Sequence, residues 1–218
     1  LKTLVLDVKV GNGSFNSSLE IARDLSHSLV QVAQGAGLQC EAILTDMNQV
    51  LGKSAGHTLE MLECIRFLLN KEKDIRLEKI TYELTSSILM MSQNLSKDEA
   101  IKKINTVVSS GLAAEKFEKM VHALGGPVDI LSSYKKYLEV SSFKKEIFSK
   151  SAGWIKNIKT RELGLILIEL GGGRKQITDK INYNVGYNNV LNVGDKIDSS
   201  QSILTVYKDS INDYENVR

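Results

Sequence analysis

The chain has 218 residues, of which 42% are hydrophobic and 25% are charged, so it can bury an ordinary core as one large domain or two small ones. Its 28 basic and 26 acidic residues give a net charge of +2, which argues against a nucleic-acid partner. The longest apolar run, residues 163–168, is too short to span a bilayer, and no signal peptide is visible. We therefore expect a cytoplasmic protein with no membrane partner.

The two cysteines, Cys40 and Cys64, lie in or next to apolar runs and have no metal-ligand spacing. This pattern predicts reduced structural thiols, as in a cytosolic protein. The chain opens on Leu1 and enters a predicted strand within three residues. We therefore expect it to be a fragment of a longer protein.

Two strands and a helix are predicted at the start of the chain. Residues 3–10 are rich in Val and Leu and end at a Gly-Asn-Gly turn, and residues 38–44 form a second such run. Ser17 and Glu20 fit a capping box for a helix between the two strands. The helix is expected to bury a face with helical spacing: Ala22, Leu25, Leu29 and Val32. This order implies a parallel strand pair with a right-handed crossover.

The rest of the chain divides near residue 137. Helices are predicted over residues 58–69, 75–91 and 113–124, and another runs from a Ser96–Glu99 capping box towards Gly111. Beyond residue 137 we expect strands over 143–148, 153–158, 181–185 and 203–207, with Trp154 in their core and a helix over 161–170 capped by Thr160. The predicted fold class is α/β: a parallel-sheet α/β domain with a helical layer over residues 1–136, then a β-rich α+β C-terminal subdomain over residues 137–218.

Polar residues just beyond the two strands are the first site candidates, because open α/β sheets bind ligands at the carboxyl ends of their strands. The turn at residues 11–13 is either a tight βα turn or a phosphate loop, and Phe15 beyond it either plugs the helix–strand junction or lines a pocket. Asp7 and Lys9 share one strand face and either pair locally or include a catalytic acid or base. After the second strand, Asp46, Asn48 and Gln49 either bond a ligand or hold their loop together.

Two further groups have both a structural and a functional interpretation, and a third group has only a structural one. Glu60 and Glu63 either face solvent from their helix or, with loop carbonyls, form an oxygen cage for a hard cation. The glycines 171–173 before Arg174 either cradle an anion or form a turn after a helix. Nothing pairs the three histidines with a nucleophile, and we interpret all of them as structural: His27, His57 and His122.

Several segments resemble the thymidine and pyrimidine-nucleoside phosphorylases. The resemblance starts with LVLDVKVGNGSF at residues 4–15 and TDMNQVLGKSAG at residues 45–56. It continues through KFEKMVHALGGP at 116–127, LGGGRKQ at 170–176, and the 181–204 region with NYNVG and VGDKID. Thr45, Asn48 and Val50 are similar to thymidine phosphorylases, whereas the sister enzymes tend to carry serine, serine and proline there.

The resemblance implies reversible phosphorolysis of thymidine to thymine and 2-deoxyribose 1-phosphate by a homodimer without an organic cofactor. It implies that Phe15 lines the base pocket, and that Leu51 and Ser54 (through backbone carbonyls) and Glu63 hold a potassium ion. No catalytic residue is assigned here, because the family's Lys-His-Ser-Thr-Gly-Gly loop and its base-gripping Arg, Ser and Lys are absent from this sequence and would lie before Leu1. The N-terminal helical domain would also lie there, and the tail after Arg218 is expected to be cut short. We expect the 218 residues alone to be inactive.

Two alternatives stay open. A broader pyrimidine-nucleoside phosphorylase would also accept uridine. A non-catalytic binding or carrier module is favoured by the short strands and Gly-Asp turns of the C-terminal part, which resemble lipoyl-type domains, although no Met-Lys-Met-like hairpin is present.

Overall fold

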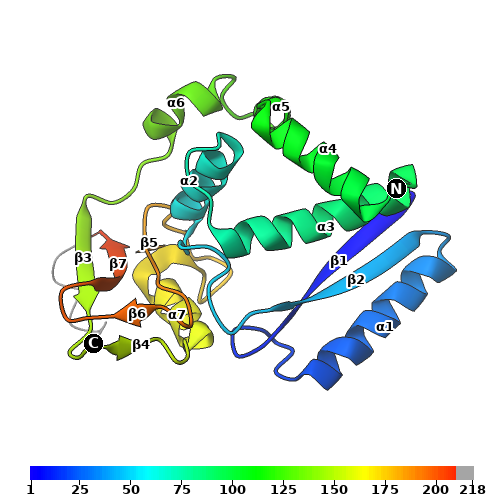
Figure 1. Cartoon of the computed structure of the whole chain (residues 1–218). Helices are drawn as coiled ribbons and strands as arrows, with labels where there is room; N and C mark the ends of the chain where they lie inside the picture. Colours follow the sequence, from blue (N-terminus) through cyan, green and yellow to red (C-terminus); the bar gives the residue numbers. More distant parts are fainter. Residues whose placement is uncertain (210–218) are drawn as a thin grey trace.

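The computed structural model describes residues 1–209, which begin with a parallel strand pair and its crossover helix (Figure 1). These elements are β1 (Thr3–Val10), α1 (Leu19–Gly35) and β2 (Gln39–Asp46). The pairing runs in register from Thr3 opposite Gln39 to Val10 opposite Asp46. Both strands therefore end at the same edge, and the predicted parallel pair is confirmed.

Helix α1 differs from the prediction in its cap and in its buried face. Its N-cap is Ser18, whose hydroxyl accepts the Ile21 amide, so the predicted Ser17–Glu20 capping box is wrong. The predicted apolar face is largely exposed, and the buried residues are small: Ala22, Ser26 and Ala33. Small side chains let α1 pack closely on β2, whereas Leu25, Leu29 and Val32 are each more than a third exposed.

Five helices follow and form the helical layer. They are α2 (His57–Leu68), α3 (Ile75–Gln93), α4 (Lys97–Ser109), α5 (Leu112–Ala123) and α6 (Ile130–Tyr137). Helices α1 and α3 lie on opposite faces of the strand pair (Figure 1). The capping box predicted at Ser96 and Glu99 is confirmed at the start of α4. A buried cluster joins α2 to α6: Leu62, Ile65, Ile130 and Tyr134.

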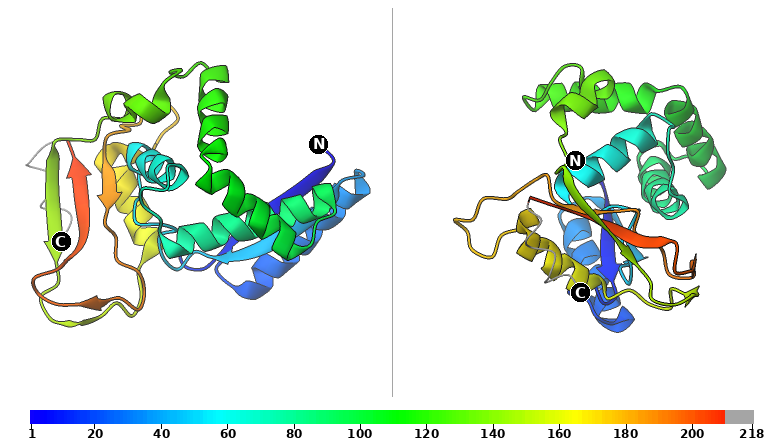
Figure 2. Two further views of the ribbon diagram at one scale, coloured as in Figure 1. Left: turned by 45° about the horizontal axis from the view of Figure 1, so that its top comes forward. Right: turned by 90° about the vertical axis from the view of Figure 1, so that its left-hand side faces the viewer.

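The C-terminal part is β-rich and contains one further helix. Its elements are β3 (Phe143–Phe148), β4 (Gly153–Trp154), α7 (Thr160–Leu167), a π-helical turn (Ile168–Gly172), β5 (Gly186–Asn188), β6 (Lys196–Ile197) and β7 (Ser202–Lys208). Antiparallel pairing gives the strand order β3-β7-β5, and β4 pairs with β6. In Figure 2, β3 and β7 run side by side, and α7 lies between this sheet and the β1–β2 pair. The α/β fold class with a β-rich C-terminal part is confirmed.

Some C-terminal predictions are wrong in detail. The strand predicted over 181–185 is a loop, and β5 begins only at Gly186; Val185 is buried by tertiary packing, which a local pattern cannot distinguish from a strand. The strand predicted from residue 153 ends at Trp154, whose side chain is 67% exposed and therefore not in the core. Helix α7 begins with Thr160, which is not its cap.

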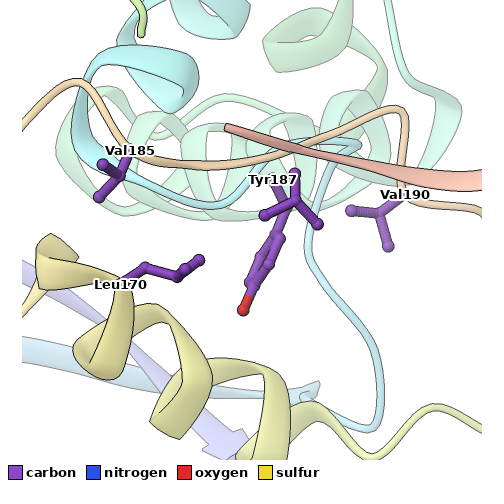
Figure 3. Packing of buried hydrophobic residues seen from close by; sticks show 5 residues of the cluster. Leu170, Val185, Tyr187 and Val190 are labelled. Carbon is purple, nitrogen blue, oxygen red and sulfur yellow. The ribbon is translucent and has the colours of Figure 1, made fainter. Parts of the chain in front are cut away.

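The C-terminal core contains residues from both parts of the chain. Leu170, Val185, Tyr187 and Val190 pack around α7 and β5 (Figure 3). Val50 and Ala55 of the loop after β2 pack against them. The Tyr187 hydroxyl points towards α7 and donates to the Leu163 carbonyl at 3.1 Å. Burial raises the pKa of this phenol well above its usual value. Within residues 1–209, none of the helices combines the length and apolar character needed to cross a bilayer.

Candidate functional site

Phe15 lies in a firmly hydrogen-bonded turn between β1 and α1. The Lys9 carbonyl accepts bonds from the Ser14 hydroxyl at 2.8 Å and the Asn16 side-chain amide at 3.0 Å. The amide of Gly11 donates to the Asn16 carbonyl at 3.1 Å. The Phe15 ring itself is 97% exposed, so the interpretation that it plugs the helix–strand junction is wrong. A rigid turn thus presents an aromatic ring at the edge where both strands end.

The polar residues after β2 hold their own loop and connect it to neighbouring segments. The Asp46 carboxylate accepts the amide and the side chain of Asn48. The Asn48 side-chain oxygen accepts the backbone amide of Asn12 at 2.9 Å. The Gln49 side-chain oxygen accepts the amide of Val193, in the C-terminal part, at 2.9 Å. These contacts favour the loop-holding interpretation of Asp46, Asn48 and Gln49.

Asp7 and Lys9 pair with each other on one strand face. The Lys9 ammonium donates to one Asp7 oxygen, and the hydroxyl of Thr45, on β2, donates to the other. The Asp7 carboxylate is therefore satisfied within the sheet. This arrangement favours a structural role over that of a catalytic acid or base.

Glu63 points from α2 into the loop that follows β2. Its carboxylate accepts the amides of Lys53 at 2.8 Å and Ser54 at 3.2 Å, together with the Ser54 hydroxyl. A side chain at Gly52 would overlap this carboxylate, so glycine there permits the close approach. The solvated-helix interpretation is therefore wrong for Glu63. Glu60, one helical turn earlier, instead accepts the amide of Gly56 at 2.9 Å.

Two of the three predicted cation ligands, Leu51 and Ser54, lie in the loop after β2, and the third, Glu63, reaches this loop from α2. Within residues 1–209, the carbonyls of Leu51 and Ser54 accept no hydrogen bond. Three donors of the loop already meet the negative charge of Glu63, so its carboxylate does not require a cation or a basic side chain. Lys53 contributes its amide, not its ammonium group. The oxygen-only ligand set still fits a hard cation.

A cavity of about 300 Å³ lies between this loop, α2 and α7. Its polar lining includes Lys9, Glu60 and Glu63, and its apolar lining includes Leu163 and Leu167 of α7. Cys64 also lines it; desolvation, followed by the nearby charges of Glu63 and Glu60, raises the pKa of its thiol. Cys64 is therefore poorly suited to act as a thiolate nucleophile.

His57 and the glycine run have structural roles. The imidazole of His57 lies 3.1 Å from the Gly172 carbonyl and edge-on to the Tyr183 ring. After the glycines, the Asp179 carboxylate accepts the amides of Lys175 and Gln176, each at 2.9 Å. These amides bind a carboxylate of the chain itself, which favours the turn interpretation over an anion cradle.

Asn12 is the residue whose importance sequence reasoning missed. The sequence predicts only that Asn12 lies in a tight βα turn or in a phosphate loop, yet its side chain bonds residues 158–161 in the C-terminal part. An asparagine between two glycines is common in turns and carries no signal for such a distant contact.

The C-terminal part matches a known protein family. Residues 154–218, which begin in β4 and include α7, β5, β6 and β7, match the model for the pyrimidine nucleoside phosphorylase C-terminal domain. Enzymes of this family are glycosyltransferases that act on nucleosides and phosphate. The match therefore supports a relationship between residues 154–218 and the pyrimidine nucleoside phosphorylases.

Proposed function

We propose that this chain is part of a thymidine phosphorylase, which converts thymidine and phosphate reversibly to thymine and 2-deoxyribose 1-phosphate. The match of residues 154–218 to the phosphorylase C-terminal domain is the observation that carries the proposal. The preference for thymidine rests on the resemblance at Thr45, Asn48 and Val50. The exposed ring of Phe15, held on a rigid turn, supports a role in contacting the base.

The proposed reaction requires no covalent enzyme nucleophile. A phosphate oxygen forms a bond to the anomeric carbon while the bond from that carbon to the base nitrogen breaks, and the electron pair of that bond leaves with the base. The protein must orient the two reactants, stabilise the negative charge on the base and exclude water. Phe15 would pack on the base face, and the phosphate-binding loop and base-gripping cations would come from residues outside this sequence. We therefore propose that residues 1–218 alone do not turn over thymidine, and that the complete protein acts as a homodimer.

A potassium ion is the proposed inorganic ligand. Its oxygen donors would be the carbonyls of Leu51 and Ser54 and the carboxylate of Glu63. The support is the free carbonyls of the first two residues and the inward orientation of the third. Bound there, the ion would neutralise charge and stiffen the loop between β2 and α2.

The alternative within the same family is an enzyme that also accepts uridine. Steady-state phosphorolysis of thymidine and uridine by the complete protein separates the two. Thymidine specificity predicts a kcat/KM for thymidine about 100-fold above that for uridine, since rejection of an extra hydroxyl by binding alone is limited to this order. Comparable values would support the broader enzyme, and failure to cleave either nucleoside would favour a binding or carrier module.

A further inference from the structure

The first turn of α7 lacks a cap from its own segment. Its N-cap residue, Lys159, makes no side-chain capping bond, although the first amides of a helix need acceptors. The side-chain oxygen of Asn12 fills this role from the other part of the chain. It accepts the amide of Thr160 at 2.8 Å and that of Arg161 at 3.4 Å. Asparagine is among the best capping residues, but here it lies 148 positions before the amide it binds.

The same side chain also donates. The Asn12 amide nitrogen lies 2.9 Å from the Ile158 carbonyl and 3.3 Å from the Asn48 side-chain oxygen. One side chain therefore binds both a carbonyl and two amides of residues 158–161, and it connects this segment to the loop after β2. Asn12 uses its acceptor and its donor together, which neither aspartate nor serine can reproduce in full.

The backbone around Asn12 is shaped for this contact. A side chain at Gly13 would lie 2.8 Å from the Thr160 methyl group and 2.7 Å from the Met47 carbonyl oxygen. A side chain at Gly11 would lie 2.7 Å from Asn48. The two flanking glycines thus let the turn approach both α7 and the loop after β2.

Hydrogen bonds within the turn couple the position of Asn12 to that of Phe15. The Ser14 amide donates to the Gly11 carbonyl at 3.0 Å, and the side chains of Ser14 and Asn16 both bond the Lys9 carbonyl. Asn12 and Phe15 therefore belong to one small, internally bonded unit. Any shift of this turn relative to α7 moves the aromatic ring as well.

We propose that Asn12 is a positioning residue. Its hydrogen bonds to residues 158–161, called the clasp below, hold the turn that carries Phe15 against α7. The clasp thereby fixes the position of the Phe15 ring relative to the C-terminal part. This inference rests on the proposed function of Phe15 as a base contact. It assigns to Asn12 no contact with the reacting atoms. Its effect on the reaction passes through the nucleoside-binding ring, so it concerns nucleoside binding more than phosphate binding.

The test combines amide hydrogen exchange with kinetics of the complete protein in three variants. Asn12→Ala removes the clasp, and Asn12→Asp retains the acceptor for Thr160 and Arg161. Ser96→Ala is the matched control, because it removes a helix cap of α4, far from the turn. Asn12→Ala should raise the exchange rate of the Thr160 amide and the KM for thymidine by about tenfold each, with the KM for phosphate and kcat changed less than about threefold.

Asn12→Asp should give values between those of the wild type and Asn12→Ala, because it keeps the acceptor but places a carboxylate oxygen next to the Ile158 carbonyl. Ser96→Ala should alter neither quantity. Unchanged Thr160 exchange in Asn12→Ala would show that the clasp does not form. Faster exchange with an unchanged KM would reduce Asn12 to a structural cap and overturn its positioning role. A wild-type protein that protects the Thr160 amide but cleaves no nucleoside would contradict the proposed function, and the positioning role with it, while leaving the clasp intact.

Discussion

Ala55 and Tyr187 exchange backbone hydrogen bonds, with the Ala55 amide donating at 3.1 Å and the Tyr187 amide donating at 2.7 Å. The bridge joins the loop after β2 to β5, and the Val190 amide extends it by donating to the Lys53 carbonyl at 3.0 Å. The loop that carries the proposed cation ligands is therefore a structural part of the C-terminal core. Substitutions that disturb the packing of that core should therefore also disturb the loop.

The first prediction concerns the glycine at this bridge. Gly186 has φ of +154°, and a side chain there would overlap the Ala55 carbonyl oxygen. Gly186→Ala should lower the free energy of unfolding by more than about 1 kcal/mol, because the clash is with backbone that cannot move aside cheaply. Denaturant unfolding measures this. Gly153→Ala is the control, since its added carbon would have open space and should change the free energy by no more than about 0.5 kcal/mol. Equal effects of the two substitutions would contradict the bridge.

The second prediction separates binding from stability at Phe15. Because the ring is 97% exposed, Phe15→Ala should change the free energy of unfolding by less than about 0.5 kcal/mol. In the complete enzyme it should raise the KM for thymidine, since loss of an aromatic contact with a bound base costs on the order of 1–3 kcal/mol. The KM for phosphate should change less. An equal loss for both substrates would contradict a specific contact between Phe15 and the base.

The third prediction tests the cation. Potassium chloride should raise the unfolding temperature of the complete protein above its value in lithium chloride of the same ionic strength, with a stabilisation of about 1.4 kcal/mol at ten times the Kd. Glu63→Gln should abolish the difference between the two salts. Glu60→Gln removes an equal charge from the same cavity and should preserve it. If the two salts give the same unfolding temperature in the wild type, the proposed site holds no potassium.

The fourth prediction concerns Cys64. Desolvation and the carboxylates of Glu63 and Glu60 raise the pKa of its thiol, so the pH midpoint of its alkylation should lie above that of N-acetylcysteine. The measurement uses a Cys40→Ser background, and Glu63→Gln should lower the midpoint. Because the folded protein holds this proton more tightly than the unfolded chain does, the contribution to stability is present below the ordinary thiol pKa and is lost as the pH rises through the raised one. A midpoint at or below that of N-acetylcysteine would contradict the described environment.

Local patterns in the sequence predicted local structure well. The apolar run of β1 and the serine–glutamate spacing at Ser96 each specify an element through neighbouring residues alone. The cap of α1 lies one residue after the predicted Ser17, because Ser17 and Ser18 are adjacent and only the backbone angles decide between them. The exposure of Trp154 and the loop ending at Val185 depend on packing between distant segments, which periodicity does not encode.

In the candidate site, too, local features are predictable from the sequence and contacts between distant segments are not. The resemblance to a family drew attention to Phe15 and Glu63, and the structure places the first on an exposed turn and turns the second into its loop. The sequence does not predict that amides of the loop compensate the charge of Glu63, because nearly every residue offers a backbone donor. The bond between Asn12 and Thr160 was equally hidden, because it exists only once the two parts of the chain are packed together.

The most direct measurement follows the fate of the sugar when the complete protein is given thymidine and inorganic phosphate. Phosphorolysis predicts a new phosphate monoester signal in phosphorus-31 NMR, formed in a one-to-one ratio with thymine and absent when phosphate is omitted. Thymine release that does not depend on phosphate, with free deoxyribose as the other product, would contradict a phosphorylase, as would the absence of any cleavage.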